Sequence, residues 1–316
     1  MNCSYLNIDC TEIDTSGMSK LTSCDDCSHR AKMWNKNIPH NLYLFWDGSP
    51  MSYLQLLTVA SFHKYNPEWG IYVYVPNTTY QQLAKNTFIP DYIGTDWYSE
   101  LCDLDYVKIV RFDLSEFGIK PDSHGIQCSD QWRARILRQK GGMYSDFDVL
   151  WLKPMTEFVN IECDGNPRDF EAVVSFARYN RGFHSNSNII AEQRSGFLKD
   201  VIERQVNITP PYAHQAYYLD IVNKAYPTLA TLREKFPRVL AVQYKTFFPY
   251  GLFDLKRLYN KTDLTPILKK NTYETDKDVM AIHWYNGAKE SKDYLNKEDY
   301  GRPCSMTTIL KNEGWL

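Results

Sequence analysis

Short apolar runs alternate with longer amphipathic segments over most of the chain. Residues 41–46 form an apolar, aromatic run closed by Asp-Gly-Ser-Pro, which predicts a buried strand that ends in a turn. The pattern then predicts a helix over 51–65, strands over 71–75 and 106–112, a helix over 130–140, and strands over 172–176 and 188–191. This order of strands and helices predicts an α/β layered fold, in which ligands bind at the carboxyl ends of strands.

The first part of the chain shows a different pattern. Residues 1–36 are polar, lack a clear periodicity and contain half of the cysteines, and the pattern changes at Ile38-Pro39. We therefore expect a cysteine-containing N-terminal extension over 1–36 and one main domain over 37–316.

Composition and charge exclude several classes of protein. A chain of 316 residues with 43% hydrophobic residues has enough apolar material for a sizeable core. Lys and Arg total 36 against 38 Asp and Glu, so there is no global positive field that would attract nucleic acid. The longest apolar stretches, such as 149–152, are far shorter than the roughly 20 residues that cross a bilayer. The N-terminus is polar and acidic, unlike a signal peptide, which predicts a cytosolic location if Met1 is the natural start.

Four cysteines near the N-terminus form a candidate metal site. The two-residue gap between Cys24 and Cys27 lets both thiolates reach one tetrahedral Zn²⁺, and Cys3 and Cys10 would complete the set. Structural zinc and disulfides remain open alternatives, and free thiols are favoured for an intracellular chain.

The stretch from Ser129 to Asp148 carries the most chemical information. Ser129 or Asp130 is expected to cap a helix, and Gly141-Gly142 to end it where a positive φ is needed. The chain is then expected to continue as a strand.

An acidic pair follows the two glycines. In an extended segment residues two apart point to the same side, so Asp146 and Asp148 are expected to face one place while Phe147 turns into the core. Two convergent carboxylates suit Mg²⁺ or Mn²⁺, held together with the phosphates of a nucleotide. A solvated strand end is the alternative.

The Asp-x-Asp triplet alone has little specificity, because the chain contains it twice more. Asp103 and Asp105 precede a predicted strand as a polar lead-in, whereas Asp276 and Asp278 lie in a charged turn and are expected to be solvated. Only the pair at 146 and 148 follows a predicted helix and a double glycine.

Several motifs in order resemble one family. SDQWR at 129–133 is followed by GGMYSDFD at 141–148, and IPHNLYLFWDG, FFPYGL and AIHWYNG occupy 38–48, 247–252 and 281–287. Together they resemble the GT-A glycosyltransferases with a DxD sugar-binding region, such as family 32 with its Golgi mannosyltransferases and galactosyltransferases. The glucosylating domains of large clostridial toxins are similar.

The resemblance implies a fold and an activity. The fold would be of GT-A type, a Rossmann-like nucleotide-binding mixed sheet flanked by helices in a single main domain. The activity would be metal-dependent, retaining transfer of a hexose from a nucleotide-sugar, UDP preferred over GDP, to a hydroxyl of a glycan or other acceptor, with Mn²⁺ or Mg²⁺ as cofactor. The rival classes are a metal-dependent hydrolase such as a phosphatase, and a non-catalytic module that binds a glycan or a partner.

The resemblance also assigns roles to residues of the central motif. Asp148 would bind the metal directly, and Asp146 would contact ribose, sugar or metal-bound water. Asp130 and Arg133 would hold hydroxyls of the donor sugar, as their i, i+3 spacing on one helical face allows. An ordinary ion pair on the helix surface is the alternative for these two.

The remaining implied residues lie elsewhere in the chain. Donor-binding roles fall on Trp46 as a stacking face for the nucleobase, Tyr144, Asn186, Asn188, and Lys289 near the leaving diphosphate. His283 would be a third metal ligand, with a satisfied buried histidine as the alternative. The family commonly has a Ser-Trp pair after this histidine, whereas Ala288 to Ser291 stand here, so the last phosphate contact of the family has no direct counterpart.

Overall fold

The computed structural model describes residues 2–3, 8–9, 37–78, 92–120, 125–160, 163–164, 169–176, 183–206, 218–270 and 275–316. Two short strands, β1 (Asn2–Cys3) and β2 (Ile8–Asp9), pair antiparallel near the N-terminus. Cys10, Cys24 and Cys27 lie outside the described residues, and for Cys3 only the backbone is described. The zinc site and the boundary after residue 36 therefore remain predictions.

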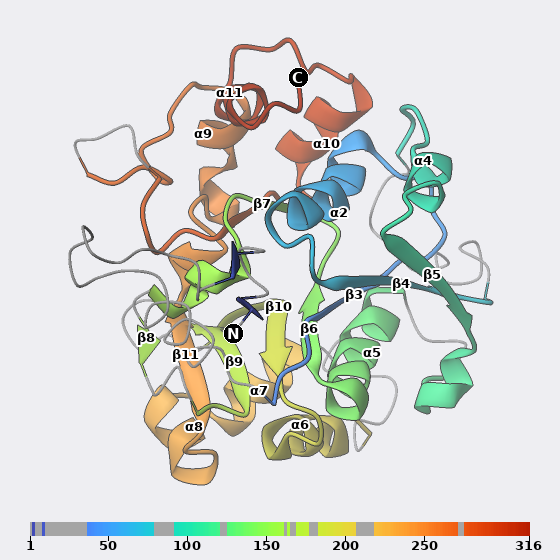
Figure 1. The fold of residues 1–316 in the computed structure, drawn as a ribbon, viewed down its shortest axis with the longest axis vertical. Coiled ribbons are helices and arrows are strands. Elements are labelled where there is room, and N and C mark those ends of the chain that lie inside the picture. Colours follow the sequence, from blue (N-terminus) through green and yellow to red (C-terminus); the bar gives the residue numbers. More distant parts are fainter. Residues whose placement is uncertain are drawn as a thin grey trace.

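One large mixed sheet dominates the structure (Figure 1). Its strands, in spatial order, are β5 (Val107–Phe112), β4 (Gly70–Pro76), β3 (Asn41–Phe45), β6 (Gly142–Ser145), β10 (Phe183–Ala191), β9 (Ala172–Phe176), β11 (Val239–Gln243) and β8 (Cys163–Asp164). The first four are parallel, and β10 runs antiparallel to both of its neighbours. A second, small sheet pairs β7 (Val149–Trp151) with β12 (Ala281–His283) antiparallel.

Apolar side chains cover both faces of the large sheet. Along β3, Leu42 and Leu44 join one buried cluster, and Tyr43 and Phe45 join another on the opposite face. A strand buried on both sides is expected to be almost continuously apolar, as residues 42–45 of β3 are. The second cluster is completed by helices α5 (Gly125–Lys140), α6 (Gly196–Val206), α7 (Tyr218–Ala225) and α8 (Leu229–Lys235).

The opposite face carries α2 (Tyr53–Tyr65) and the small sheet. Leu56, Val59 and Phe62 of α2 face the large sheet, whereas Leu54 and Leu57 contribute to a third cluster. This third cluster packs the small sheet against helices at the top of Figure 1, namely α9 (Leu255–Tyr259), α10 (Lys289–Asn296) and α11 (Ser305–Asn312). The remaining short helices are α4 (Tyr98–Cys102), η2 (Leu114–Phe117), η3 (Met155–Asn160), η5 (Tyr244–Thr246) and η6 (Leu252–Asp254).

The expected α/β fold with a mixed sheet flanked by helices is confirmed, and the predicted elements agree closely with the observed ones. Two boundaries were wrong. Strand β10 begins at Phe183 and not at Asn188. Helix α5 begins at Gly125, so Ser129 and Asp130 lie inside the helix and do not cap it. Their side chains bond instead to Tyr144 and Arg133, because a tertiary network offers them buried partners.

The two glycines after α5 have the expected conformation. Gly141 and Gly142 have φ values of +66° and +114°, in the region that favours glycine. A Cβ at Gly142 would lie 2.7 Å from the main-chain oxygen of Asn41 in β3. Glycine is therefore needed both for the turn and for the close approach of β6 to β3.

The other Asp-x-Asp triplets differ from each other. Asp103 and Asp105 are exposed, as expected. Asp278 is only 4% exposed, and Lys245 Nζ lies 2.8 Å from its carboxylate, so the expectation that it is solvated was wrong. A lysine far away in the sequence compensates its charge.

Helices long and apolar enough to cross a bilayer are absent from the described parts of the chain.

Candidate functional site

The acidic pair lies in the bend that joins the two sheets. Strand β6 ends at Ser145 and β7 begins at Val149, so the segment between them is a bend and not the expected strand. The bend is held at both ends: the Asp146 N–H donates to the Ser187 carbonyl at 2.8 Å, and the Thr58 hydroxyl donates to the Phe147 carbonyl at 2.7 Å.

The expected division of side chains is nevertheless present. Phe147 is 6% exposed and belongs to the core cluster of α2 and the sheet. Asp146 and Asp148 line one pocket. Their common orientation thus results from the bend and not from strand periodicity.

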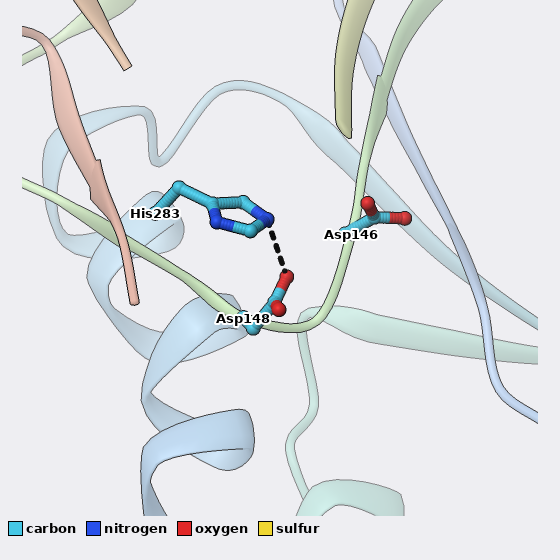
Figure 2. A group of neighbouring side chains, drawn as sticks. All are labelled: Asp146, Asp148 and His283. Atoms are coloured by element: carbon cyan, nitrogen blue, oxygen red, sulfur yellow. Dashed lines mark ion pairs between the residues drawn. The ribbon is translucent and has the colours of Figure 1, made fainter. Parts of the chain in front are cut away.

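His283 completes a group of three potential metal ligands. It ends β12 and pairs with Val149 of β7, which places the imidazole beside the neighbouring Asp148. His283 Nε2 lies 3.0 Å from Asp148 Oδ1, and ligand atoms of His283, Asp148 and Asp146 all lie within 4.8 Å of one another (Figure 2). Two carboxylates and one imidazole form a donor set that suits a divalent cation such as Mn²⁺.

The chain after His283 folds back around Asp148. The Asn286 N–H donates to Asp148 Oδ2 at 2.9 Å, and the Trp284 N–H donates to the Asp148 carbonyl at 2.8 Å. Between them Tyr285 adopts a left-handed conformation with φ +55°. Burial raises the pKa of Asp148, but His283 and the Asn286 N–H outweigh burial and hold the pKa below its usual value. Asp148 is therefore ionised at neutral pH.

Asp146 lies in a different environment. Its Oδ1 accepts a hydrogen bond of 2.6 Å from the Tyr144 hydroxyl and lies 3.1 Å from Nη2 of Arg133. Burial raises the pKa of Asp146 to about 6, although Arg133 opposes the shift, and the nearby charge of Asp148 adds to it. The two carboxylates thus differ in how readily they take up a proton.

Arg133 connects the helix to the acidic bend. It is 3% exposed, and its Nη2 lies 2.9 Å from Asp130 Oδ1, so this ion pair is buried and not the surface pair considered as an alternative. The guanidinium also lies 4.4 Å from the centre of the Tyr144 ring. Burial lowers the pKa of Arg133, but Asp146, Tyr144 and Asp130 outweigh it and raise the pKa above its usual value. Arg133 therefore stays charged in the interior.

The pocket has a volume of about 240 Å³ and combines aromatic, acidic and amide groups. Its lining residues are Phe45, Trp46, Asp47, Ser49, Gln55, Gly125, Ile126, Ser129, Arg133, Tyr144, Asp146, Phe147, Asp148, Asn286 and Gly287. Trp46 is 4% exposed and contacts Phe147 edge-on at 4.9 Å between ring centres, so it is both a core residue and part of the pocket wall. Its stacking role remains a prediction.

The other sequence-predicted residues are less close to the pocket. Asn188 is buried on β10 opposite Ser145, and it does not line the pocket. Asn186 belongs to the same strand, and its side chain lies outside the described residues. Lys289 is exposed at the first position of α10 and does not line the pocket either.

Gln55 and Asn286 are among the pocket residues that were missed from the sequence. Gln55 has a readable signal, since Ser52-x-x-Gln55 has the spacing of a helix-capping box. Asn286 acts through its main-chain N–H, which no residue type reveals.

One family of known proteins matches part of the chain. Residues 25–164 match the family described as "Glycosyltransferase sugar-binding region containing DXD motif". The matched residues include the acidic pair Asp146 and Asp148. The match covers 140 of the 316 residues, less than half of the chain. No curated protein matches the chain.

Several solved structures resemble the fold. PaToxG glycosyltransferase is 15% identical, with 67% of this chain and 75% of that chain covered and a TM-score of 0.44. The galactosyltransferase LgtC, solved with donor and acceptor sugar analogs, is 12% identical over 82% of this chain and 95% of that chain, with a TM-score of 0.42. The catalytic domain of alpha-toxin from Clostridium novyi is 14% identical over 58% of this chain and 61% of that chain, with a TM-score of 0.35.

Proposed function

We propose that this protein is a metal-dependent, retaining glycosyltransferase of GT-A type. It moves a hexose from a nucleotide-sugar, UDP-linked in preference to GDP-linked, to a hydroxyl of a glycan or other acceptor. The observation that carries the proposal is the group of Asp146, Asp148 and His283, whose two carboxylates line a pocket with Trp46 and lie within the segment that matches the DXD family. A cytosolic location remains part of the proposal.

The residues of the bend fit a divalent cation. Asp148 is ionised and would hold Mn²⁺ or Mg²⁺ directly, with His283 and Asp146 as further ligands. When bound, the cation supplies positive charge that stabilises the leaving diphosphate. We prefer Mn²⁺ because an imidazole is included in the donor set.

The protein side chains bind and orient the donor. Trp46 offers an apolar wall for the nucleobase, and Asp130 with Arg133 would bind hydroxyls of the hexose. Arg133 is held by two carboxylates, so its guanidinium is fixed before a ligand arrives. Such preorganised groups stabilise developing charge without reorganisation during the reaction.

Retention fits attack of the acceptor hydroxyl on the face from which the diphosphate leaves. A leaving phosphate oxygen would then accept the proton of the hydroxyl. Asp146 and Asp148 are committed to the cation site, so we assign neither of them as a covalent nucleophile.

The test is an assay with Mn²⁺ and a panel of UDP- and GDP-sugars. Release of nucleoside diphosphate is expected, with transfer to an added sugar acceptor or slow hydrolysis. Release of phosphate from simple esters would favour a hydrolase, and no turnover of any substrate would favour a binding module. Either result would contradict the proposal.

A further inference from the structure

The side-chain amide of Gln55 has a fixed orientation at the start of α2. The Ser52 N–H and the Ser52 hydroxyl both donate to Gln55 Oε1, at 2.7 and 2.8 Å. A backbone N–H can only donate, so the amide atom that faces Ser52 must be the carbonyl oxygen. The amide nitrogen Nε2 therefore points away from Ser52.

Nε2 has no acceptor in the described part of the chain. Gln55 is 6% exposed and lines the pocket together with Phe147 and Asp148. Nε2 is not one of the fully buried unpaired atoms of the described residues, so it is accessible from the pocket, where a ligand oxygen can accept from it. The pocket thus contains two N–H donors that are oriented before a ligand binds.

These donors lie beside the candidate cation site. One turn after Gln55, Thr58 donates to the Phe147 carbonyl in the middle of the acidic bend. Helical side chains lean towards the N-terminus, so the Gln55 amide covers the start of α2. This helix has 13 residues and no acidic residue in its first turn, so the positive end of its dipole is not neutralised by its own side chains. The Asp96 carboxylate accepts from the Met51 N–H at 2.8 Å just before this helix, so the two donors of Gln55, more than the helix dipole, favour an anionic oxygen here.

We propose that Gln55 donates from Nε2 to a phosphate oxygen of the donor's diphosphate. This inference rests on the proposed function and deepens it. Asp148 would hold the cation that offsets the charge of the diphosphate, and Gln55 would donate to the same diphosphate from α2. Gln55 would therefore favour nucleoside diphosphates over nucleosides, while Trp46 contacts the base.

Calorimetric titration of UDP with Mn²⁺, and of uridine, into wild-type protein and variants tests the proposal. Gln55→Glu keeps an acceptor oxygen for Ser52, so the helix start is preserved, but it removes both donors. We expect the Kd of UDP to rise about 10-fold or more, because a hydrogen bond to a charged group is lost, while the affinity for uridine stays unchanged. Gln55→Ala removes the donors without adding a charge, and it should also raise the Kd of UDP.

A matched control separates binding from helix capping. Ser52→Ala loses the hydroxyl bond to Gln55 and keeps the amide, so its UDP affinity should stay within about 2-fold of wild type. Unchanged UDP affinity in both Gln55 variants would overturn the proposal. Equal losses of affinity for UDP and for uridine would also overturn the proposal, because Gln55 would then contact the nucleoside. A wild-type protein that binds no nucleoside diphosphate would overturn the proposed function itself, together with this inference.

Discussion

The buried guanidinium of Arg133 forms an ion pair with the partly exposed carboxylate of Asp146, with Nη2 3.1 Å from Oδ1. The same Nη2 lies 2.9 Å from Asp130. One arginine from α5 thus compensates two carboxylates, of which one belongs to the helix and the other to the acidic bend. The contacts of Arg133 therefore stabilise the fold and also hold Asp146 in position at the site.

Removal of Arg133 should destabilise the protein. Arg133→Ala leaves Asp130 and Asp146 without their cation in the interior, and we expect the free energy of unfolding to fall by about 3–5 kcal/mol. Urea denaturation followed by circular dichroism measures this change. Lys199 forms an exposed pair with Glu203, so Lys199→Ala should change the stability by less than about 0.5 kcal/mol. Equal effects of the two substitutions would contradict the buried role of Arg133.

Asp148 should be essential for activity. Asp148→Ala removes a cation ligand, and we expect loss of Mn²⁺ binding and a fall in transfer rate of more than about 100-fold, with an unchanged circular dichroism spectrum. Asp103→Ala changes an exposed residue of another Asp-x-Asp triplet and should leave the rate unchanged. An active Asp148→Ala variant would show that the cation site is wrongly assigned.

Mn²⁺ binding should depend on pH through Asp146. Its pKa in the folded protein is about 6, above the usual 3.8. The folded state therefore binds this proton more tightly than the unfolded chain, so the stabilisation from Asp146 is complete below pH 3.8 and is lost as the pH rises through 6. A cation requires the ionised carboxylate, so its affinity should rise over the same window.

Thermal melting with and without Mn²⁺ measures this pH dependence. The increase in Tm caused by Mn²⁺ should be larger at about pH 7 than at about pH 5, because Asp146 is then ionised. In Asp146→Asn the difference between the two pH values should shrink. The same increase at both pH values in the wild type would argue against a raised pKa at Asp146.

Gly142 should tolerate no side chain. Gly142→Ala combines φ +114° with a Cβ 2.7 Å from the Asn41 carbonyl, so we expect a loss of more than about 2 kcal/mol and a displaced β6. Gly118 has φ +65° with open space around it, so Gly118→Ala should cost only about 1 kcal/mol. Comparison of the two melting temperatures separates steric conflict from backbone strain.

Local patterns in the sequence predicted β3 to β6, β9, β10, α2 and α5, but no element after Ala191. The apolar run of β3, the double glycine after α5 and the acidic pair follow from residue type and spacing, which act over a few residues. The predictions were wrong where contacts with residues distant in the sequence determine the partners and the burial of a side chain. Ser129 and Asp130 resemble helix caps until Arg133 and Tyr144 are placed next to them, and Asp278 resembles a solvated residue until Lys245 reaches it.

The site was predictable only in part for the same reason. Asp146 and Asp148 were recognised together, but the order of strands that brings β12 and His283 to them depends on pairing between segments more than a hundred residues apart. The donor from Asn286 belongs to the main chain, so its position follows from the fold alone.

Asp146 follows a strand of the large sheet, whereas Asp148 precedes a strand of the small one. A cation shared by their carboxylates would cross-link the two sheets at the point where the chain passes from one to the other. Occupancy of that point would then be transmitted through β7 to β12 and to the C-terminal helices packed on them. If the cation stabilises the small sheet in this way, the amide hydrogens of β12 should exchange more slowly after addition of Mn²⁺.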